Sequence, residues 1–221
     1  MSGPCGLDWK RKGFGETRMI SHRYKCIFIH IPRCGGTSIE HWIEGTDWWN
    51  VDPCSKHLLA SQARELYAQY WDTYFKFAFV REPEARTRSM LKYADHFGLD
   101  ATYGGDEVTI SFGKYRERFA LPEERDVIVE HDHRFCQPSE INRKGKAPES
   151  IYQNILDERI DYVGQIDNFP THIADIAASL GISKPFRFWE ERSAYSRLRL
   201  SEESRQEIAT MYRRDIEEYV F

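Results

Sequence analysis

Residues 24–40, YKCIFIHIPRCGGTSIE, form the stretch from which the expected fold follows. The first half is a run of large apolar and β-branched residues without polar alternation, which is typical of a strand buried on both faces of a parallel sheet. Pro32 and the pair Gly35-Gly36 then break the strand. Apolar residues three to four apart, from Ile39 onward, indicate that a helix follows. The stretch therefore predicts a buried strand, a glycine turn and a helix.

The same stretch predicts a binding site for an anion. A glycine turn that leads into a helix N-terminus directs backbone N–H groups at one point, where the helix dipole adds positive potential. Thr37 and Ser38 add hydroxyl donors, and Arg33 adds a positive charge. The nucleotide-triphosphate loop G-x-x-x-x-G-K-[ST] needs a lysine where this chain has Gly36, so we expect an anion such as phosphate bound without a dedicated metal. A tight turn without a ligand is the alternative.

Composition limits the classes of protein to which the chain can belong. A length of 221 residues suits one domain, and a formal net charge of −4 argues against a general nucleic-acid binder. No apolar run approaches the roughly 18 residues of a transmembrane segment, and the N-terminal stretch lacks the apolar core of a secretory signal. The five cysteines include no C-x-x-C pair, which favours free thiols in the cytoplasm over a zinc site.

A second informative segment runs from Tyr74 to Tyr93, YFKFAFVREPEARTRSMLKY. Residues 75–80 predict another buried strand, and the proline that follows suits the first turn of a helix. Arg81 leaves the carboxyl end of this strand, where ligands bind in parallel sheets, and Ser89 lies about two helical turns later. The two side chains can share one phosphate, and Arg86 and Arg88 are expected to strengthen the positive field. A solvated basic helix face is the alternative.

The remaining pattern alternates strands with helices and predicts a three-layer α/β/α fold with a central, mostly parallel sheet. Residues 1–23 are expected to form a loosely held arm before a single domain of residues 24–221. One helix is predicted over residues 59–71, helical spacing recurs from 108 to 119, and a strand is expected over 159–165. Further helices are predicted from Pro170 to a C-cap at Gly181 and after Ser201. Trp48 and Trp49 either fill the core or line an acceptor pocket.

Taken together, these segments resemble the sulfotransferases that use 3′-phosphoadenosine 5′-phosphosulfate (PAPS), in the family that includes carbohydrate sulfotransferases and small bacterial members. The sequence IFIHIPRCGGTS is similar to the family's IFIHIPKTGGTS, and FKFAFVREPEARTRS is similar to its FKFAFVRNPxxRxxS. Weaker similarities are HRFCQ at 133–137, DYVGQIDNF at 161–169 and the C-terminal YRRDIEEYVF. The resemblance covers about residues 24–221, and two ordered motifs make it specific.

The resemblance implies a P-loop-like nucleotide-binding fold and metal-independent sulfuryl transfer from PAPS. The loop residues Arg33, Cys34, Gly35, Gly36, Thr37 and Ser38 would hold the 5′-phosphosulfate. Arg81 and Ser89 would hold the 3′-phosphate. The family has lysine and threonine where this chain has Arg33 and Cys34. Arg33 can neutralise the leaving oxygen but cannot donate a proton at ordinary pH. Cys34 either gains thiolate character beside the cationic loop or simply fills space.

For the general base, the resemblance favours His57, because several relatives place a catalytic histidine between the first helix and the second strand. A neutral imidazole is suited to accept the proton of an attacking hydroxyl. Glu40 is the rival base, since other branches of the family use a glutamate in the helix after the loop. His133 matches a family element near the donor, and with His57, Trp48 and Trp49 it is a candidate substrate contact. The acceptor is expected to be a hydroxyl, less readily an amine, of a carbohydrate or small molecule, by family analogy.

Two other functions fit parts of the sequence. A small-molecule kinase with an atypical phosphate loop would need an acidic metal ligand after a strand, and Asp161 and Asp167 are poorly placed for that role. A non-catalytic relative that binds the nucleotide is compatible with the changes at Arg33 and Cys34. Retained nucleotide binding without transfer to any acceptor would identify this last class.

Overall fold

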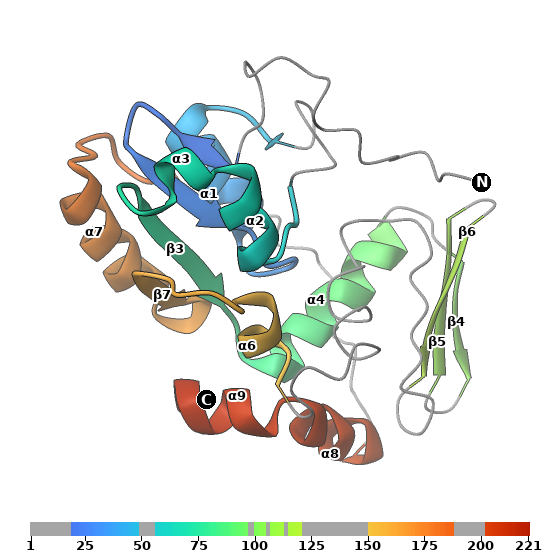
Figure 1. Ribbon diagram of the computed structural model, residues 1–221. Helices are drawn as coiled ribbons and strands as arrows, with labels where there is room; N and C mark the ends of the chain where they lie inside the picture. Colours follow the sequence, from blue (N-terminus) through green and yellow to red (C-terminus); the bar gives the residue numbers. More distant parts are fainter. Residues whose placement is uncertain are drawn as a thin grey trace.

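A four-stranded sheet forms the centre of the computed structural model, which describes residues 19–48, 56–96, 100–104, 107–112, 115–120, 150–187 and 202–221 (Figure 1). The strand order is β1 (Ile20–Ser21), β2 (Cys26–Ile29), β3 (Phe75–Val80) and β7 (Tyr162–Gln165). β1 pairs antiparallel with β2, whereas β2, β3 and β7 run parallel. The chain is therefore a mixed α/β protein with a mostly parallel sheet, as the sequence predicts.

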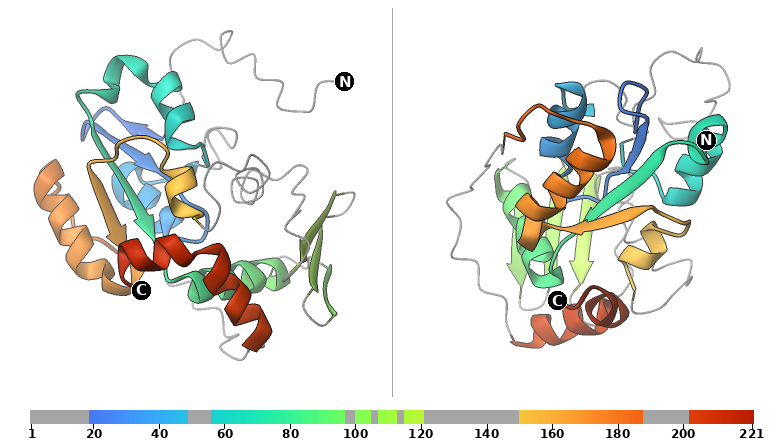
Figure 2. Two further views of the ribbon diagram at one scale, coloured as in Figure 1. Left: turned by 60° about the horizontal axis from the view of Figure 1, so that its bottom comes forward. Right: turned by 90° about the vertical axis from the view of Figure 1, so that its left-hand side faces the viewer.

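The central strands are apolar on both faces because helices cover both faces. On one face Phe79 of β3 packs on Phe169 of α7 (Phe169–Leu180), with ring centroids 4.9 Å apart. The same face receives α1 (Gly36–Glu44), whose Trp42 contacts Phe186 beyond α7. On the opposite face, the Lys76 ammonium donates to a carbonyl of α3 (Ala68–Trp71). Figure 2 shows α1 and α7 on one side of the sheet and α2–α3 on the other.

The expected arm at residues 1–23 does not end where the sequence suggested. Met19 and Ile20 are buried, and the Met19 N–H donates to the Tyr67 hydroxyl at 3.0 Å. The Met19 carbonyl accepts from the Phe28 N–H at 2.9 Å. Residues 19–21 therefore belong to the sheet, since they add its antiparallel edge strand. Residues 1–18 lie outside the described part of the chain.

The helical spacing expected from residue 108 to 119 is wrong. This part of the chain forms an antiparallel three-stranded sheet of β4 (Asp100–Gly104), β5 (Glu107–Phe112) and β6 (Tyr115–Ala120). β5 reads EVTISF, in which apolar and polar residues alternate, and a period of two is typical of a strand. The sheet lies beyond α4 (Pro83–His96), away from the main sheet (Figure 1).

Two helices expected to be continuous are each divided. Residues 59–71 form α2 (Ala60–Leu66) and α3, with a break at Tyr67. The C-terminal helix consists of α8 (Glu202–Met211) and α9 (Arg213–Tyr219), with a break at Tyr212. The short helix α6 (Tyr152–Ile155) precedes β7. Gly181 closes α7 in a left-handed conformation with φ 65°, which confirms the expected C-cap. In the described ranges, no helix has the length and apolar character that a bilayer-spanning segment requires.

The glycine pair before α1 is required by two different contacts. Gly35 has φ 73°, a left-handed conformation that glycine adopts without strain. Gly36 has no such φ, but a Cβ atom on it would lie 2.1 Å from Nε2 of His30. The His30 ring therefore occupies the space that a side chain at position 36 would need.

Replacing Gly36 with alanine should consequently destabilise the fold, although alanine is the better helix former. We expect Gly36→Ala to lower the free energy of unfolding by about 1–3 kcal/mol, the usual cost of overpacking. In a His30→Ala background the same substitution should cost little. Urea unfolding of the two single variants and the double variant measures this coupling. An equal cost in both backgrounds would contradict the contact.

Candidate anion-binding and catalytic site

The loop between β2 and α1 has the geometry that an anion cradle needs. Arg33 and Gly35 both have positive φ, so the chain turns sharply before the first helical residue. Gly35 occupies the N-cap position of α1 without a side-chain cap, and the first turn of the helix carries no acidic residue. Thr37 is exposed and Ser38 is half-buried at this end of the helix. The positive end of α1 is therefore available to an anion rather than satisfied by a side chain of its own first turn.

The two segments predicted to bind phosphate meet at Arg33. Its Nε donates to the hydroxyl of Ser89 in α4 at 3.1 Å, and its carbonyl accepts from Nη1 of Arg81 at 3.4 Å. Arg81 directly follows β3, and β3 is the parallel neighbour of β2. Residues 48 and 56 positions apart in sequence are thus brought together at the carboxyl ends of adjacent strands. The structure places Arg81 and Ser89 on the same loop, as the sequence indicates.

Donors without acceptors remain in this cluster, which we name the arginine–serine cluster: Arg33, Arg81 and Ser89. The Ser89 oxygen accepts from Arg33, so the hydroxyl hydrogen has no acceptor among the described residues. Nε of Arg81 is buried and likewise has no hydrogen-bond partner in the described part of the chain. Guanidinium and hydroxyl groups are the usual ligands of phosphate and sulfate. The cluster therefore has both the charge and the free donors that a second anionic group would use.

Two arginines expected to strengthen the positive field have other roles. Arg88 forms an ion pair with Glu84 one turn earlier in α4. Arg86 is only 1% exposed, and its Nε donates to the Pro32 carbonyl at 2.9 Å, beneath the loop. The expectation is therefore wrong for both, because one charge is paired and the other lies in the core.

Cys34 fills space beneath the loop. The side chain is 1% exposed, and burial raises the pKa of its thiol above the ordinary value. The thiolate alternative is therefore wrong, since the thiol form is favoured near neutral pH, and the space-filling alternative holds.

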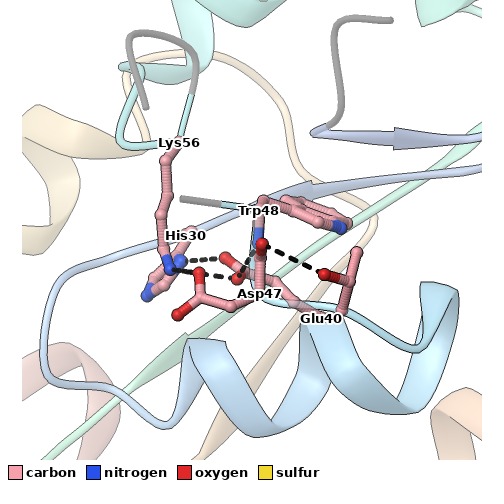
Figure 3. A network of polar contacts seen from close by, with 6 residues as sticks. His30, Glu40, Asp47, Trp48 and Lys56 are labelled. Carbon is pink, nitrogen blue, oxygen red and sulfur yellow. Dashed lines mark hydrogen bonds and ion pairs between the residues drawn. The ribbon is translucent and has the colours of Figure 1, made fainter. Parts of the chain in front are cut away.

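A buried polar network lies behind α1, and Glu40 is at its centre (Figure 3). The Glu40 carboxylate is fully buried, and Oε1 accepts from Nδ1 of His30 at 2.5 Å. Oε2 accepts from the backbone N–H of Trp48 and from Nζ of Lys56, both at 3.0 Å. Lys56 also pairs with Asp47. His30, Asp47 and Lys56 are absent from the sequence-based candidates, because no local pattern signals partners contributed by separate segments.

Burial and charge set the protonation of this network. Burial raises the pKa of Glu40 to about 7, although the Lys56 ammonium and the Trp48 N–H act in the opposite direction. Burial, and then the charge of Lys56, hold the pKa of His30 well below its usual range, so its ring is neutral. An ionised carboxylate only accepts hydrogen bonds, so Nδ1 of His30 carries the hydrogen and Nε2 keeps the lone pair.

The two candidate bases lie on either side of His30. The ring of His57 packs edge-to-face against that of His30, with centroids 4.6 Å apart, and His57 is 8% exposed. Glu40 contacts the other side of the same ring and has no exposed surface. Of the two, only His57 has any surface through which an acceptor could be reached without rearrangement.

The tryptophan pair is only half described. Trp48 is 1% exposed and packs edge-to-face on Phe28, with ring centroids 6.0 Å apart. It therefore fills the core, and in this conformation it offers no surface to a substrate. Trp49 and His133, the other candidate substrate contacts, lie outside the described residues.

Comparisons with protein-family models, with curated proteins and with solved structures gave no match. In the segments that the structure describes, no group of three or more His, Cys, Asp and Glu side chains is arranged to hold a metal ion. Functional assignment therefore depends on the geometry of the loop, the arginine–serine cluster and the buried network.

Glu40 should make the stability of the protein depend on pH. Its pKa is about 7 in the folded state and near the usual 4.5 in the unfolded chain, so only the folded state retains the proton between these values. Its contribution to the free energy of unfolding is therefore fully present below the lower value and declines as pH rises through the higher one, by up to about 3 kcal/mol. Glu40→Gln should remove this decline.

Urea unfolding of both proteins from about pH 5 to pH 8 measures the difference, because the window spans both pKa values. Glu158→Gln, at the surface pair with Arg64, is the matched control. A difference between Glu40→Gln and the unaltered protein that does not change with pH would contradict the assignment.

Proposed function

We propose that the protein is a sulfotransferase that moves the sulfuryl group of PAPS to a hydroxyl of a carbohydrate or small-molecule acceptor. The observation that carries the proposal is the meeting of Arg33, Arg81 and Ser89 at the carboxyl ends of β2 and β3. PAPS carries one phosphate at each of two ribose positions, and the chain offers an adjacent donor set for each. A P-loop-like sulfotransferase fold accommodates this arrangement, since ligands of parallel α/β sheets bind at this edge.

The donor set for the 5′-phosphosulfate consists of the α1 N-terminus and the side chains beside it. The Thr37 and Ser38 hydroxyls and the N–H groups from Gly35 onward suit the phosphate oxygens. Arg33 supplies a charge that persists at all ordinary pH values, so it stabilises negative charge on the leaving oxygen without donating a proton. Arg81 and Ser89 suit the 3′-phosphate, because both retain donors that lack acceptors in the described part of the chain.

For proton removal we assign His57, with the His30–Glu40 pair behind it. Transfer in line requires the acceptor oxygen opposite the leaving oxygen, and a neutral imidazole there takes the hydroxyl proton as the new S–O bond forms. Glu40 fixes the tautomer of His30, and the His30 ring fixes the edge on which His57 packs. Glu40 thus acts through His30, since it has no surface of its own.

A non-catalytic nucleotide-binding protein is the second candidate. The enclosure of both candidate bases favours it, because His57 is 8% exposed and Glu40 is fully buried. Donor binding without transfer to any acceptor, in a broad screen of sugars and phenols, would select this second function.

Calorimetry with 3′-phosphoadenosine 5′-phosphate (PAP), the product of the donor, tests the nucleotide assignment. Without Mg²⁺, we expect PAP to bind more tightly than adenosine diphosphate. Arg81→Ala and Ser89→Ala should each weaken PAP binding, since the loss of a charge-assisted hydrogen bond costs about 1.5–3 kcal/mol. Arg64→Ala, at an exposed arginine of α2, is the matched control for charge removal. A requirement for Mg²⁺, or equal affinity for the two nucleotides, would defeat the proposal.

The assignment of the base makes a separate prediction. His57→Ala should leave PAP affinity unchanged but lower turnover by about 10²–10⁴-fold, the usual contribution of a general base. The measurement is transfer of radiolabelled sulfate from PAPS to an acceptor found by screening. His22→Ala, near Tyr74 at the surface, is the control. Full activity of His57→Ala would move the role to another residue.

A further inference from the structure

The C-terminal helices reach back beneath the loop between β2 and α1. Tyr212, at the break between α8 and α9, accepts a hydrogen bond from Nη1 of Arg86 at 2.6 Å. The same guanidinium donates through Nε to the Pro32 carbonyl at 2.9 Å. Arg86 and Tyr212 are 1% and 4% exposed, so this chain of contacts is shielded from water. The loop is therefore supported from below by a residue 126 positions after Arg86 in the sequence.

A second support reaches Arg81. The Tyr152 hydroxyl, at the start of α6, donates to the Arg81 carbonyl at 2.5 Å and accepts from the Arg81 N–H at 3.4 Å. Tyr152 has no exposed surface. The N-terminal end of α6 is held by Asp215 of α9, whose Oδ2 accepts from the N–H groups of Ile151 at 2.6 Å and Tyr152 at 3.1 Å. Through α6, α9 thus supports the backbone from which the Arg81 side chain extends.

We propose that Tyr212 and Tyr152 are positioning residues that support the two halves of the nucleotide site separately. Tyr212, acting through Arg86, fixes the loop assigned to the 5′-phosphate. Tyr152 fixes the backbone of Arg81 and with it the group assigned to the 3′-phosphate. The inference rests on the proposed function, because it identifies what each half of that site depends on.

The contacts are separable because each hydroxyl bonds to a different segment. Tyr212 reaches the segment after β2, whereas Tyr152 reaches the segment after β3. The two rings pack edge-to-face with centroids 5.4 Å apart, and phenylalanine at either position keeps this packing. Without the Tyr212 hydroxyl, Pro32 would be the only described oxygen that accepts from Arg86, since its Nη2 already lacks a partner among the described residues.

Two nucleotides and two variants separate the supports. PAP carries both phosphates, and adenosine 5′-monophosphate (AMP) is the same molecule without the 3′-phosphate. We expect Tyr152→Phe to weaken PAP about tenfold and to leave AMP unchanged, because one charge-assisted contact is misplaced. Tyr212→Phe should weaken PAP and AMP by about the same factor. Tyr162→Phe, which removes a hydroxyl bonded to α7 at the other end of β7, should change neither affinity.

The outcomes distinguish this inference from the proposed function. If the unaltered protein does not prefer PAP to AMP, the proposed function fails. If it prefers PAP but Tyr152→Phe weakens both nucleotides equally, or neither variant weakens any, only the separate supports are overturned. A loss of stability alone would not change the ratio of PAP to AMP affinity, so this ratio identifies a positioning role. Should either phenylalanine variant fail to fold, Asp215→Asn and Arg86→Lys alter the same two supports from the opposite end, with the same expected split.

Discussion

The fold around the site depends on one carboxylate that is removed from water. A buried ionised group is costly unless its oxygens are hydrogen-bonded and its charge is balanced. Glu40 meets this condition only because the end of β2, the segment after α1 and the segment before α2 each supply a donor. These segments have few other reasons to adopt one arrangement, since each is a connection rather than a regular element. The position of His57 beside His30 follows from the same contacts.

The glycine loop is held between this network and the C-terminal helices. On one side the His30 ring lies against Gly36, and on the other Arg86 bonds to Pro32. Both supports are buried, so the charges that face an anion, Arg33 and Arg81, are carried on a backbone fixed by residues that do not face it. Rigid support of this kind is what a site needs to bind a transition state more tightly than a substrate.

The sequence alone was sufficient for β2, the glycine turn, α1, β3 and the cap at Gly181, because these features have strong local patterns. It failed over residues 108–119, where the residues that suggest a helix also alternate with polar ones, so length and turn signals had to decide. It also failed for Arg86, whose neighbours in sequence resemble a solvated helix face. Burial of an arginine depends on partners such as Tyr212, which no window of local sequence contains. The same reason explains why Lys56 and His30 were missed.

The reach of α9 across the molecule has a consequence for how the protein is made. The segment that carries Arg33 is synthesised early, whereas Asp215 and Tyr212 leave the ribosome among the last residues of the sequence. The loop and the arginine–serine cluster therefore lack their underside until synthesis is nearly complete, and contacts of such long separation form slowly. A nascent chain is thus expected to leave the ribosome with a formed sheet but without a nucleotide site, so that ligand cannot assist folding until the end.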